Sequence, residues 1–489
     1  MRDSLSQKSE KPKEECGLMA VTNSPNACSL VALGLQQLQH RGQQGAGCAA
    51  WENGTFHVRR GAGLVMDVFD VEGNTSMLAG TAAIGHVRYS TAGGTGVENI
   101  QPFTVQTDIG DVAFAHNGNL TNSDIIKEKL LGKGYGFVAK SDTEVALNLF
   151  VSLTEEKDFI LRLIKAFSQL QGAFSFLAMA DGKIAAVRDP YGMRPLVMGR
   201  KDDGWVFASE TTALNKVRAE YVRDIKPGEI VIAETGKFAE TKSYFLPAKA
   251  PERFCVFEYI YFMRPDSMFG GRHAREFRRA IGREVAKEFQ YETDVVVPVP
   301  DSGIPAAEGV AEQLSVPYCL GGIQRGHYSG RSFIAPTAAS RKNKTEIKLS
   351  ADSFYLNGKR VALVDDSIVR GTTAKNIVEL VRRAGAKEVH FISACPMIKN
   401  PCFFGVDMRT RKELICCNYD YDLKKIAGFL GADTVSFASV DALYRAFDGF
   451  SGRDDPRRFT CDACMTDEYE VPVFDPKKVA IMNDRTHVR

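Results

Sequence analysis

The sequence has no long apolar run, no large excess of one charge and no paired pattern of cysteines. No apolar stretch approaches the roughly 20 residues that cross a bilayer as a helix, so we expect no membrane partner. A formal net charge of +2 argues against nucleic acid as a general partner. Eleven cysteines at irregular spacing do not resemble a disulfide framework and favour a reducing, cytoplasmic location.

Two further absences narrow the interpretation. No Walker A string occurs, which disfavours an ATP-binding P-loop. The first fifteen residues, MRDSLSQKSEKPKEE, lack the apolar core of a secretory signal and contain acids that a transit peptide avoids. We expect residues 1–15 to be disordered and the globular part to begin at Cys16.

The chain of 489 residues is long enough for two domains, and its strand patterns change part-way along. Between residues 16 and 245, short β-type runs such as GAFSFLAMA and EIVIAE alternate with amphipathic helices, which predicts stacked sheets with helices outside. From about residue 290, DVVVPVP and KRVALVDD are continuous apolar strands, each followed by a glycine-containing loop and a helix. These strands are typical of an open, parallel α/β sheet. The proline-containing segment 245–254 predicts a link between the halves.

Cys16 follows two glutamates in KPKEECGLMAV and has no evident histidine partner. A cysteine nucleophile needs a base to form the thiolate. Cleavage between Glu15 and Cys16 would create an α-amine with a pKa of about 8 next to the thiol, and this amine could take the proton. The alternative is that Cys16 is a small buried apolar residue at the start of a strand.

Other stretches of the first half carry groups suited to acyl chemistry. HVRYST places Arg88 at a strand end, where a guanidinium can hold a carboxylate. AHNGNLTN offers the side-chain amide of Asn117 and the backbone N–H of Gly118 to a developing oxyanion, although NG is also a common hairpin turn. KSDTEVAL begins a helix that Ser141 or Asp142 caps.

Together with LQHRGQQGAG, these stretches resemble the glutamine amidotransferase domain of the N-terminal-nucleophile hydrolases, over residues 16–245. The resemblance implies a four-layer αββα fold in which Cys16 attacks the glutamine carboxamide, while Asn117 and Gly118 hold the oxyanion. It also implies a set of glutamine-binding residues: Arg41, Arg88 and Asp142.

The string KRVALVDDSIVRGTTAKNIVELVRRAG predicts a strand ending in Asp365 and Asp366, a loop, and a helix that ends at Gly385. Paired carboxylates at a strand end can bind ribose hydroxyls or Mg²⁺. The loop supplies backbone N–H groups, hydroxyls and a helix N-terminus for a phosphate. The alternative is that Asp365 and Asp366 are two solvated acids before a turn, which would explain the dipeptide DD but not the whole string.

This string resembles the phosphoribosylpyrophosphate motif of type I phosphoribosyltransferases, and the resemblance implies an α/β domain over residues 255–450. VVVPVPDSG matches an earlier loop of that family and RGHYSGRSFI its mobile loop, where His327 replaces a common arginine. The implied magnesium ligands are Ser302, Asp365 and Asp366. The implied phosphoribosylpyrophosphate-binding residues are Asp301, Ser302, Gly303, Tyr328, Arg331, Lys348, Asp365, Asp366, Ser367, Arg370, Gly371, Thr372 and Thr373.

The fusion of these two halves resembles the amidophosphoribosyltransferase family. The family reaction implies glutamine and 5-phosphoribosyl 1-pyrophosphate as substrates, and gives 5-phosphoribosylamine, glutamate and pyrophosphate at the first committed step of purine (IMP) synthesis. The resemblance also implies a pentosyltransferase that forms homotetramers and is inhibited by purine nucleotides. The alternative is a catalytically silent regulator that keeps the phosphoribosyl pocket.

Four cysteines match the iron–sulfur subgroup of this family, which also has a propeptide, here residues 1–15. CDAC supplies Cys461 and Cys464, in a C-terminal tail over residues 451–489, and Cys255 and Cys402 complete the set. Four thiolates are the usual complement of a [4Fe-4S] cluster, for which we expect a structural role. Cys395, Cys416 and Cys417 are competing ligands, and zinc is the competing metal.

Overall fold

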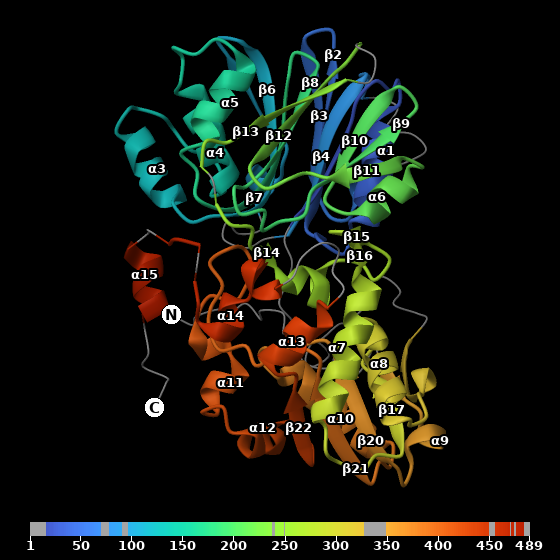
Figure 1. The fold of residues 1–489 in the computed structure, drawn as a ribbon. Helices are drawn as coiled ribbons and strands as arrows, with labels where there is room; N and C mark the ends of the chain where they lie inside the picture. The colour runs from blue at the N-terminus through green and yellow to red at the C-terminus, as the bar shows by residue number, and fades with distance from the viewer. Residues whose placement is uncertain are drawn as a thin grey trace, which may run out of the picture.

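The computed structural model describes residues 16–69, 78–89, 96–236, 240–248, 250–326, 349–448, 455–469, 471–473 and 476–483. They form two halves, one above the other in Figure 1. In the described part of the chain, no helix has both the length and the apolar character needed to cross a membrane.

The upper half contains two antiparallel sheets. The first has seven strands in the order β11 (Glu220–Asp224), β9 (Val197–Lys201), β10 (Gly204–Ala208), β1 (Gly17–Val21), β4 (Ala82–Arg88), β2 (Gly45–Glu52) and β3 (Thr55–Ala62). The second has six, in the order β13 (Thr241–Phe245), β12 (Glu229–Glu234), β8 (Lys183–Arg188), β7 (Gly172–Ala180), β6 (Gly110–Leu120) and β5 (Phe103–Thr107).

Apolar side chains from both sheets meet between them, where Ile84 of β4 and Leu177 of β7 share one buried cluster. Helices cover the outer faces: α1 (Ala27–Gln37), α2 (Val65–Val68) and α6 (Thr211–Lys216) lie on the first sheet, and α3 (Ser123–Leu131), α4 (Asp142–Val151) and α5 (Phe159–Phe167) on the second. A strand with one face toward the other sheet and one toward a helix is buried on both sides. All nine residues of β7 are buried in this way. The predicted αββα arrangement is confirmed.

The lower half is built on a parallel sheet in the order β17 (Val295–Pro298), β20 (Arg360–Asp365), β21 (Glu388–Ser393) and β22 (Thr434–Phe437). Because side chains alternate along a strand, the two faces of β20 reach different partners. Leu363 packs toward α10 (Thr372–Arg383) and α12 (Leu423–Leu430), while Ala362 and Val364 pack toward α7 (Ala274–Glu288) and α8 (Ile304–Leu314). The predicted α/β domain is confirmed.

Short elements complete the described chain. They are η2 (Val97–Asn99), β14 (Phe254–Cys255), the π-helical turn η3 (Glu258–Phe262), β15 (Met268–Phe269), β16 (Arg272–His273), η4 (Leu320–Gly322), β18 (Ile323–Arg325), β19 (Leu349–Ala351), α9 (Ser353–Leu356), η6 (Arg411–Glu413), α11 (Ile415–Asn418), α13 (Val440–Ala446), η7 (Pro456–Arg458), β23 (Thr460–Cys461), α14 (Ala463–Thr466) and α15 (Pro476–Asn483).

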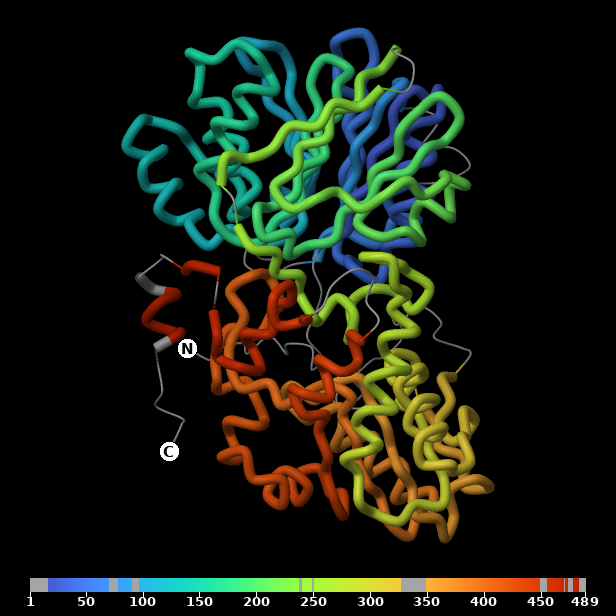
Figure 2. The backbone as a smooth tube through the Cα atoms, in the orientation of Figure 1, coloured from blue at the N-terminus to red at the C-terminus, as the bar shows by residue number. Residues whose placement is uncertain are grey.

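Hydrogen bonds from main-chain N–H groups join the two halves. The N–H of Arg253 donates to the carbonyl of Tyr191 at 2.7 Å. The N–H of Gly270 donates to the carboxylate of Asp224 at 2.8 Å. β14 pairs in parallel with β23, so the C-terminal region returns to the junction, where the red and yellow-green parts of the tube meet in Figure 2.

Candidate active sites

Cys16 lies one residue before β1, the central strand of the first sheet. Gly17 is paired with Val87, so the antiparallel register sets Cys16 opposite Arg88. Burial raises the pKa of the Cys16 thiol to about 11; the main chain of Tyr89 and the charge of Arg88 oppose this rise, and Asp142 adds to it. The thiol therefore needs a proton acceptor before it can act as a nucleophile.

Asn117 and Gly118 lie near the end of β6, which packs against β1 and β4 across the two sheets. The Asn117 side chain is fully buried, and neither its oxygen nor its nitrogen has a hydrogen-bond partner among the described residues. A buried polar group left unpaired costs about 1–3 kcal/mol, so this amide is a candidate ligand contact. Gly118 has a φ of +137°, and a Cβ there would lie 2.0 Å from the carbonyl oxygen of Ala173, so only glycine fits.

The two remaining groups of this site are Arg88 and Asp142. Arg88 is the last residue of β4, is 7% exposed, and donates to the carbonyl of Gly96 at 3.1 Å. Ser141 is the N-cap of α4, since it accepts from the N–H of Thr143 at 3.3 Å, and this leaves Asp142 free to face the site.

The carboxylate of Asp142 has contacts of its own. Its Oδ2 accepts from the N–H of Leu120 at 2.9 Å, and its Oδ1 lies 3.3 Å from Nδ1 of His116. Burial would raise the pKa of Asp142, but His116, the N–H of Leu120 and the charge of Lys478 hold it below its usual value. The structure therefore brings Cys16, Arg88 and an ionised Asp142 into one electrostatic neighbourhood.

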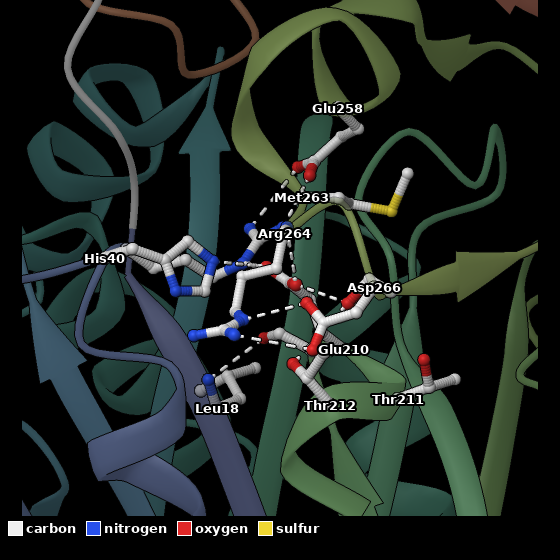
Figure 3. Close-up of polar contacts among 12 residues, drawn as sticks. Leu18, His40, Glu210, Thr211, Thr212, Glu258, Met263, Arg264 and Asp266 are labelled. Carbon is white, nitrogen blue, oxygen red and sulfur yellow. Dashed lines mark hydrogen bonds and ion pairs between the residues drawn. The ribbon is translucent and has the colours of Figure 1, made fainter. Parts of the chain in front are cut away.

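Arg41 lies in a different environment. Its guanidinium is fully buried, donates to Glu210 and contacts Glu258 of η3 at 2.6 Å. Figure 3 shows Glu210 between His40, at 2.7 Å, and the N–H of Arg264, at 3.0 Å. These contacts join the two halves and give no support to the predicted contact between Arg41 and glutamine, which stays a prediction.

Sequence reasoning missed this buried ion-pair network. Glu258 also binds Arg194 at 3.0 Å, so the carboxylate neutralises two arginines. A signal was available, because Glu258 interrupts the apolar run CVFEYIYF. A charged residue in such a run indicates a buried ion pair, since charged residues are almost never fully buried unless paired.

Asp365 and Asp366 lie at the carboxyl end of β20, each 1% exposed. The N–H of Asp366 donates to Oδ1 of Asp365 at 2.9 Å, and the hydroxyl of Ser367 donates to Oδ2 of Asp366 at 2.7 Å. Burial lowers the pKa of Arg278 to about 10, while Asp366 acts against that shift, which places a buried cation near this carboxylate. No pattern in the sequence indicated that Arg278 would act on Asp366.

The two predicted loops meet at this strand end. Gly371 is the N-cap of α10 with a φ of +81°, and a Cβ there would lie 2.4 Å from Cδ1 of Ile415. Gly303, the N-cap of α8, is equally confined, because its Cβ would lie 2.5 Å from the carbonyl oxygen of Val364. The loop that carries Asp301 and Ser302 thus lies against the end of β20, where ligands bind in open α/β sheets.

The other predicted residues of this half either contact other protein groups or lie outside the described residues. Asp301 is exposed and pairs with Arg325 at 3.2 Å, and Thr372 and Thr373 begin α10. Arg370 contacts Glu413 and donates to the carbonyl of Asp407 at 3.2 Å. Several predictions lie outside the described residues: the propeptide 1–15, His327, Tyr328, Arg331 and Lys348.

Tyr89, which follows Arg88, lies within electrostatic reach of the phosphoribosyl half. Burial raises the pKa of Tyr89 to about 12, Asp407 adds to the rise, and Arg370 and Arg409 oppose it. Tyr89 follows Arg88 and its main chain reaches Cys16, whereas Arg370 belongs to the loop between β20 and α10. Tyr89 therefore contacts Cys16 through its main chain, while its side chain is within electrostatic reach of Arg370.

The four predicted cluster cysteines gather at the junction. Cys255 is the register partner of Cys461 in the β14–β23 pair, and the Cys402 sulfur accepts from the N–H of Phe404 at 3.4 Å. Burial raises the pKa of Cys464 well above its usual value, and Cys402, Cys255 and Cys461 add to the effect. Within the described ranges, no three potential ligands are close enough to hold a single metal ion.

Two family models match the chain. One, described as a glutamine amidotransferase domain, matches residues 86–216, and the other, described as a phosphoribosyl transferase domain, matches residues 271–420. The amidophosphoribosyltransferase of Rhizobium etli is 42% identical over 94% of this chain and 93% of its own length. The chain belongs to the amidophosphoribosyltransferase family. The chloroplastic amidophosphoribosyltransferase of Vigna aconitifolia is 44% identical over 94% of this chain and 92% of its own length.

Solved structures agree with this family. The glutamine phosphoribosylpyrophosphate amidotransferase of B. subtilis, in complex with ADP and GMP, has a TM-score of 0.87 at 39% identity and covers 94% of this chain and 98% of its own. As a member of the amidophosphoribosyltransferase family, the protein is a transferase that uses glutamine and phosphoribosylpyrophosphate in purine biosynthesis. Nothing in the comparisons supports the alternative of a silent regulator.

Proposed function

We propose that the Cys16 thiol opens glutamine and that the α-amine of a processed Cys16 takes its proton. Asn117 and Gly118 would stabilise the oxyanion, Arg88 would bind the substrate carboxylate and Asp142 the substrate ammonium group. The unpaired, fully buried amide of Asn117 carries this proposal, because it supplies a donor at no cost of reorganisation. Attack by the thiol would form a glutamyl thioester and release ammonia, and water would then hydrolyse the thioester to glutamate and restore the thiol.

The N-terminus and the fate of Cys16 test this proposal. We expect the measured mass of the active enzyme to be that of a chain that begins at Cys16 and lacks residues 1–15. Cys16→Ala should abolish pyrophosphate release with glutamine but preserve it with ammonia. A fully active enzyme that retains the fifteen residues would contradict the role of the α-amine.

At the second site, Asp365 and Asp366 would hold the ribose and Ser302 would contribute to Mg²⁺ binding. The backbone and hydroxyls of residues 367–373 would hold the 5-phosphate at the start of α10, because helix N-termini favour anions. Buried carboxylates beside Ser302 fit a hard cation that prefers oxygen ligands. When bound, Mg²⁺ would offset the charge of the departing pyrophosphate.

Transfer between the sites requires neutral ammonia, since ammonium has no lone pair for the attack on ribose C1. A passage that excludes water would prevent its protonation and loss. The main-chain contact of Tyr89 with Cys16 and the electrostatic effect of Arg370 on its side chain support a route between the sites.

We further propose that the four junction cysteines bind a [4Fe-4S] cluster that joins the C-terminal region to the junction. In such a cluster each thiolate binds a different iron, so its ligands lie farther apart than the four ligands of one zinc ion. Cys255, Cys402 and Cys461 all act on the pKa of Cys464, so the four neighbouring thiols could supply the four thiolates of such a cluster. Cys417 is less suited, since its sulfur is engaged with the carbonyl of Lys399 at 3.1 Å.

Three further properties are proposed from the family. None of the eleven cysteines, all of them among the described residues, forms a disulfide, which supports a cytoplasmic location. The solved relative bound to ADP and GMP supports inhibition by purine nucleotides. A homotetramer is proposed from the family resemblance alone.

A further inference from the structure

A lysine from the C-terminal helix reaches the strand that carries the oxyanion groups. Nζ of Lys478, on α15, donates to the carbonyls of Leu120 and Thr121, each at 3.2 Å. Leu120 ends β6, the strand of Asn117 and Gly118. In Figure 1, α15 lies below α3 at the boundary between the halves.

Leu120 connects this lysine to the glutamine site. Its carbonyl accepts from Lys478, and its own N–H donates to the Asp142 carboxylate at 2.9 Å. The positive charge of Lys478 also favours the ionised form of Asp142. The main chain of Leu120 therefore links Lys478 to Asp142: its N–H orients the Asp142 carboxylate, and its carbonyl holds the lysine whose charge favours the ionised carboxylate.

The same end of β6 has a second anchor from the lower half. Nδ2 of Asn119 donates to the carbonyl of Phe403 at 2.7 Å, next to Cys402. Two separate segments of the lower half, 403 and 478, thus fix the three residues that follow Gly118. These anchors add to the pairing of this strand end with β7, where Leu120 is the register partner of Gly172 and the N–H of Thr121 donates to the carbonyl of Gln171 at 2.8 Å.

We propose that Lys478 is a positioning residue for glutamine: it fixes the end of β6 and, through Leu120, holds Asp142 where it can accept the ammonium group of the substrate. The inference rests on the proposed role of Asp142. Lys478 itself touches no substrate. The C-terminal helix also meets η6, where Arg411 donates to the carbonyl of Met482 at 3.2 Å, so the effect on glutamine belongs to the contacts of Lys478 and not to the helix as a whole.

The acid dependence of glutamine use follows from the groups around Asp142. The titratable groups that act on it are His116 from β6, Cys16 before β1 and Lys478 from α15. Removal of the lysine charge raises the pKa of Asp142, so the carboxylate is protonated at a higher pH. The acidic limb of kcat/KM for glutamine should move upward in pH.

The test uses steady-state kinetics of the full-length enzyme with glutamine or ammonia as nitrogen donor. For Lys478→Met we expect a KM for glutamine about tenfold higher, as for a lost charged hydrogen bond, with ammonia-dependent rates unchanged. Lys478→Arg should restore the KM. Lys478→Gln should recover most of the KM but keep the shifted acidic limb, since it donates without charge. Lys424→Met, at an exposed site of α12, is the control.

An unchanged KM and acidic limb in Lys478→Met would overturn the proposal. Equal losses with both nitrogen donors would also overturn it, because they would indicate a general structural role. If Asp142→Asn leaves the KM for glutamine unchanged, the proposed role of Asp142 fails and the inference fails with it. Should the Met variant not fold, the comparison of Gln with Arg decides the question.

Discussion

At the scale of single residues, burial and hydrogen bonding separate groups that bind a ligand from groups that support the fold. Asn117 is buried without a partner among the described residues, whereas Arg41 is buried with two carboxylate partners. An unpaired amide costs stability in the free enzyme, and a ligand can offset that cost. The guanidinium of Arg41 is already paired in the free enzyme, so a ligand would not relieve any such cost there.

Asn117→Ala should therefore lower kcat for glutamine by about 10²- to 10³-fold, the usual effect of removing one oxyanion donor. The melting temperature should change little, because no hydrogen bond of the free enzyme is lost. Kinetics with both nitrogen donors and thermal unfolding check this. Asn148→Ala, which removes a half-buried side chain that donates to the carbonyl of Gly136 at 2.9 Å, should leave glutamine kinetics unchanged.

Glu210 provides a prediction about pH. Burial would raise its pKa, but Arg41 and His40 lower it far below the usual value. Its stabilising effect is therefore present above the unfolded value of about 4.3 and is lost as pH falls toward the folded value.

Glu210→Gln should reduce the free energy of unfolding by about 3–5 kcal/mol at pH 7, because it leaves Arg41 partly unpaired. The difference from wild type should shrink as pH falls below about 4. Urea denaturation at several pH values measures both effects. A constant difference across this range would contradict the ionised state of Glu210.

At the scale of elements, strand ends and helix starts place the chemistry. Asp365 and Asp366 end one strand, and Gly371 and Gly303 begin the helices α10 and α8 at the same edge of the sheet. Each glycine is closely confined by neighbouring atoms. The loops are therefore preformed around the space where a phosphate would bind.

Gly371→Ala should weaken phosphoribosylpyrophosphate binding. An alanine in the left-handed region is strained by about 1–3 kcal/mol, and its Cβ would also meet Ile415. We expect KM for phosphoribosylpyrophosphate to rise about tenfold or more with glutamine and with ammonia. Gly428→Ala is the matched control, since nothing lies within 4 Å of a Cβ within α12.

At the scale of the whole molecule, the junction joins the two activities. Buried ion pairs, the β14–β23 pairing and the four cysteines all lie there. Anaerobic iron analysis should find four iron atoms per chain and no zinc. Cys461→Ser should lower the iron content and the melting temperature, whereas Cys48→Ser, in the buried core of the first sheet, should keep the iron. Zinc without iron would contradict the cluster.

The sequence by itself determined the two fold classes, the strands and the motif residues, because periodicity, glycine positions and strand-end acids are local signals. Cys16, Asn117, Gly118, Asp365 and Asp366 were predicted from such motifs together with the family resemblance, and their roles stay predictions. Only the tertiary structure decided which distant groups support them. Asp366 acts electrostatically on Arg278, Glu258 pairs with Arg41, and Lys478 binds the carbonyl of Leu120, although each pair is separated by tens to hundreds of residues. Such contacts depend on how sheets and helices pack, so no local pattern could predict them.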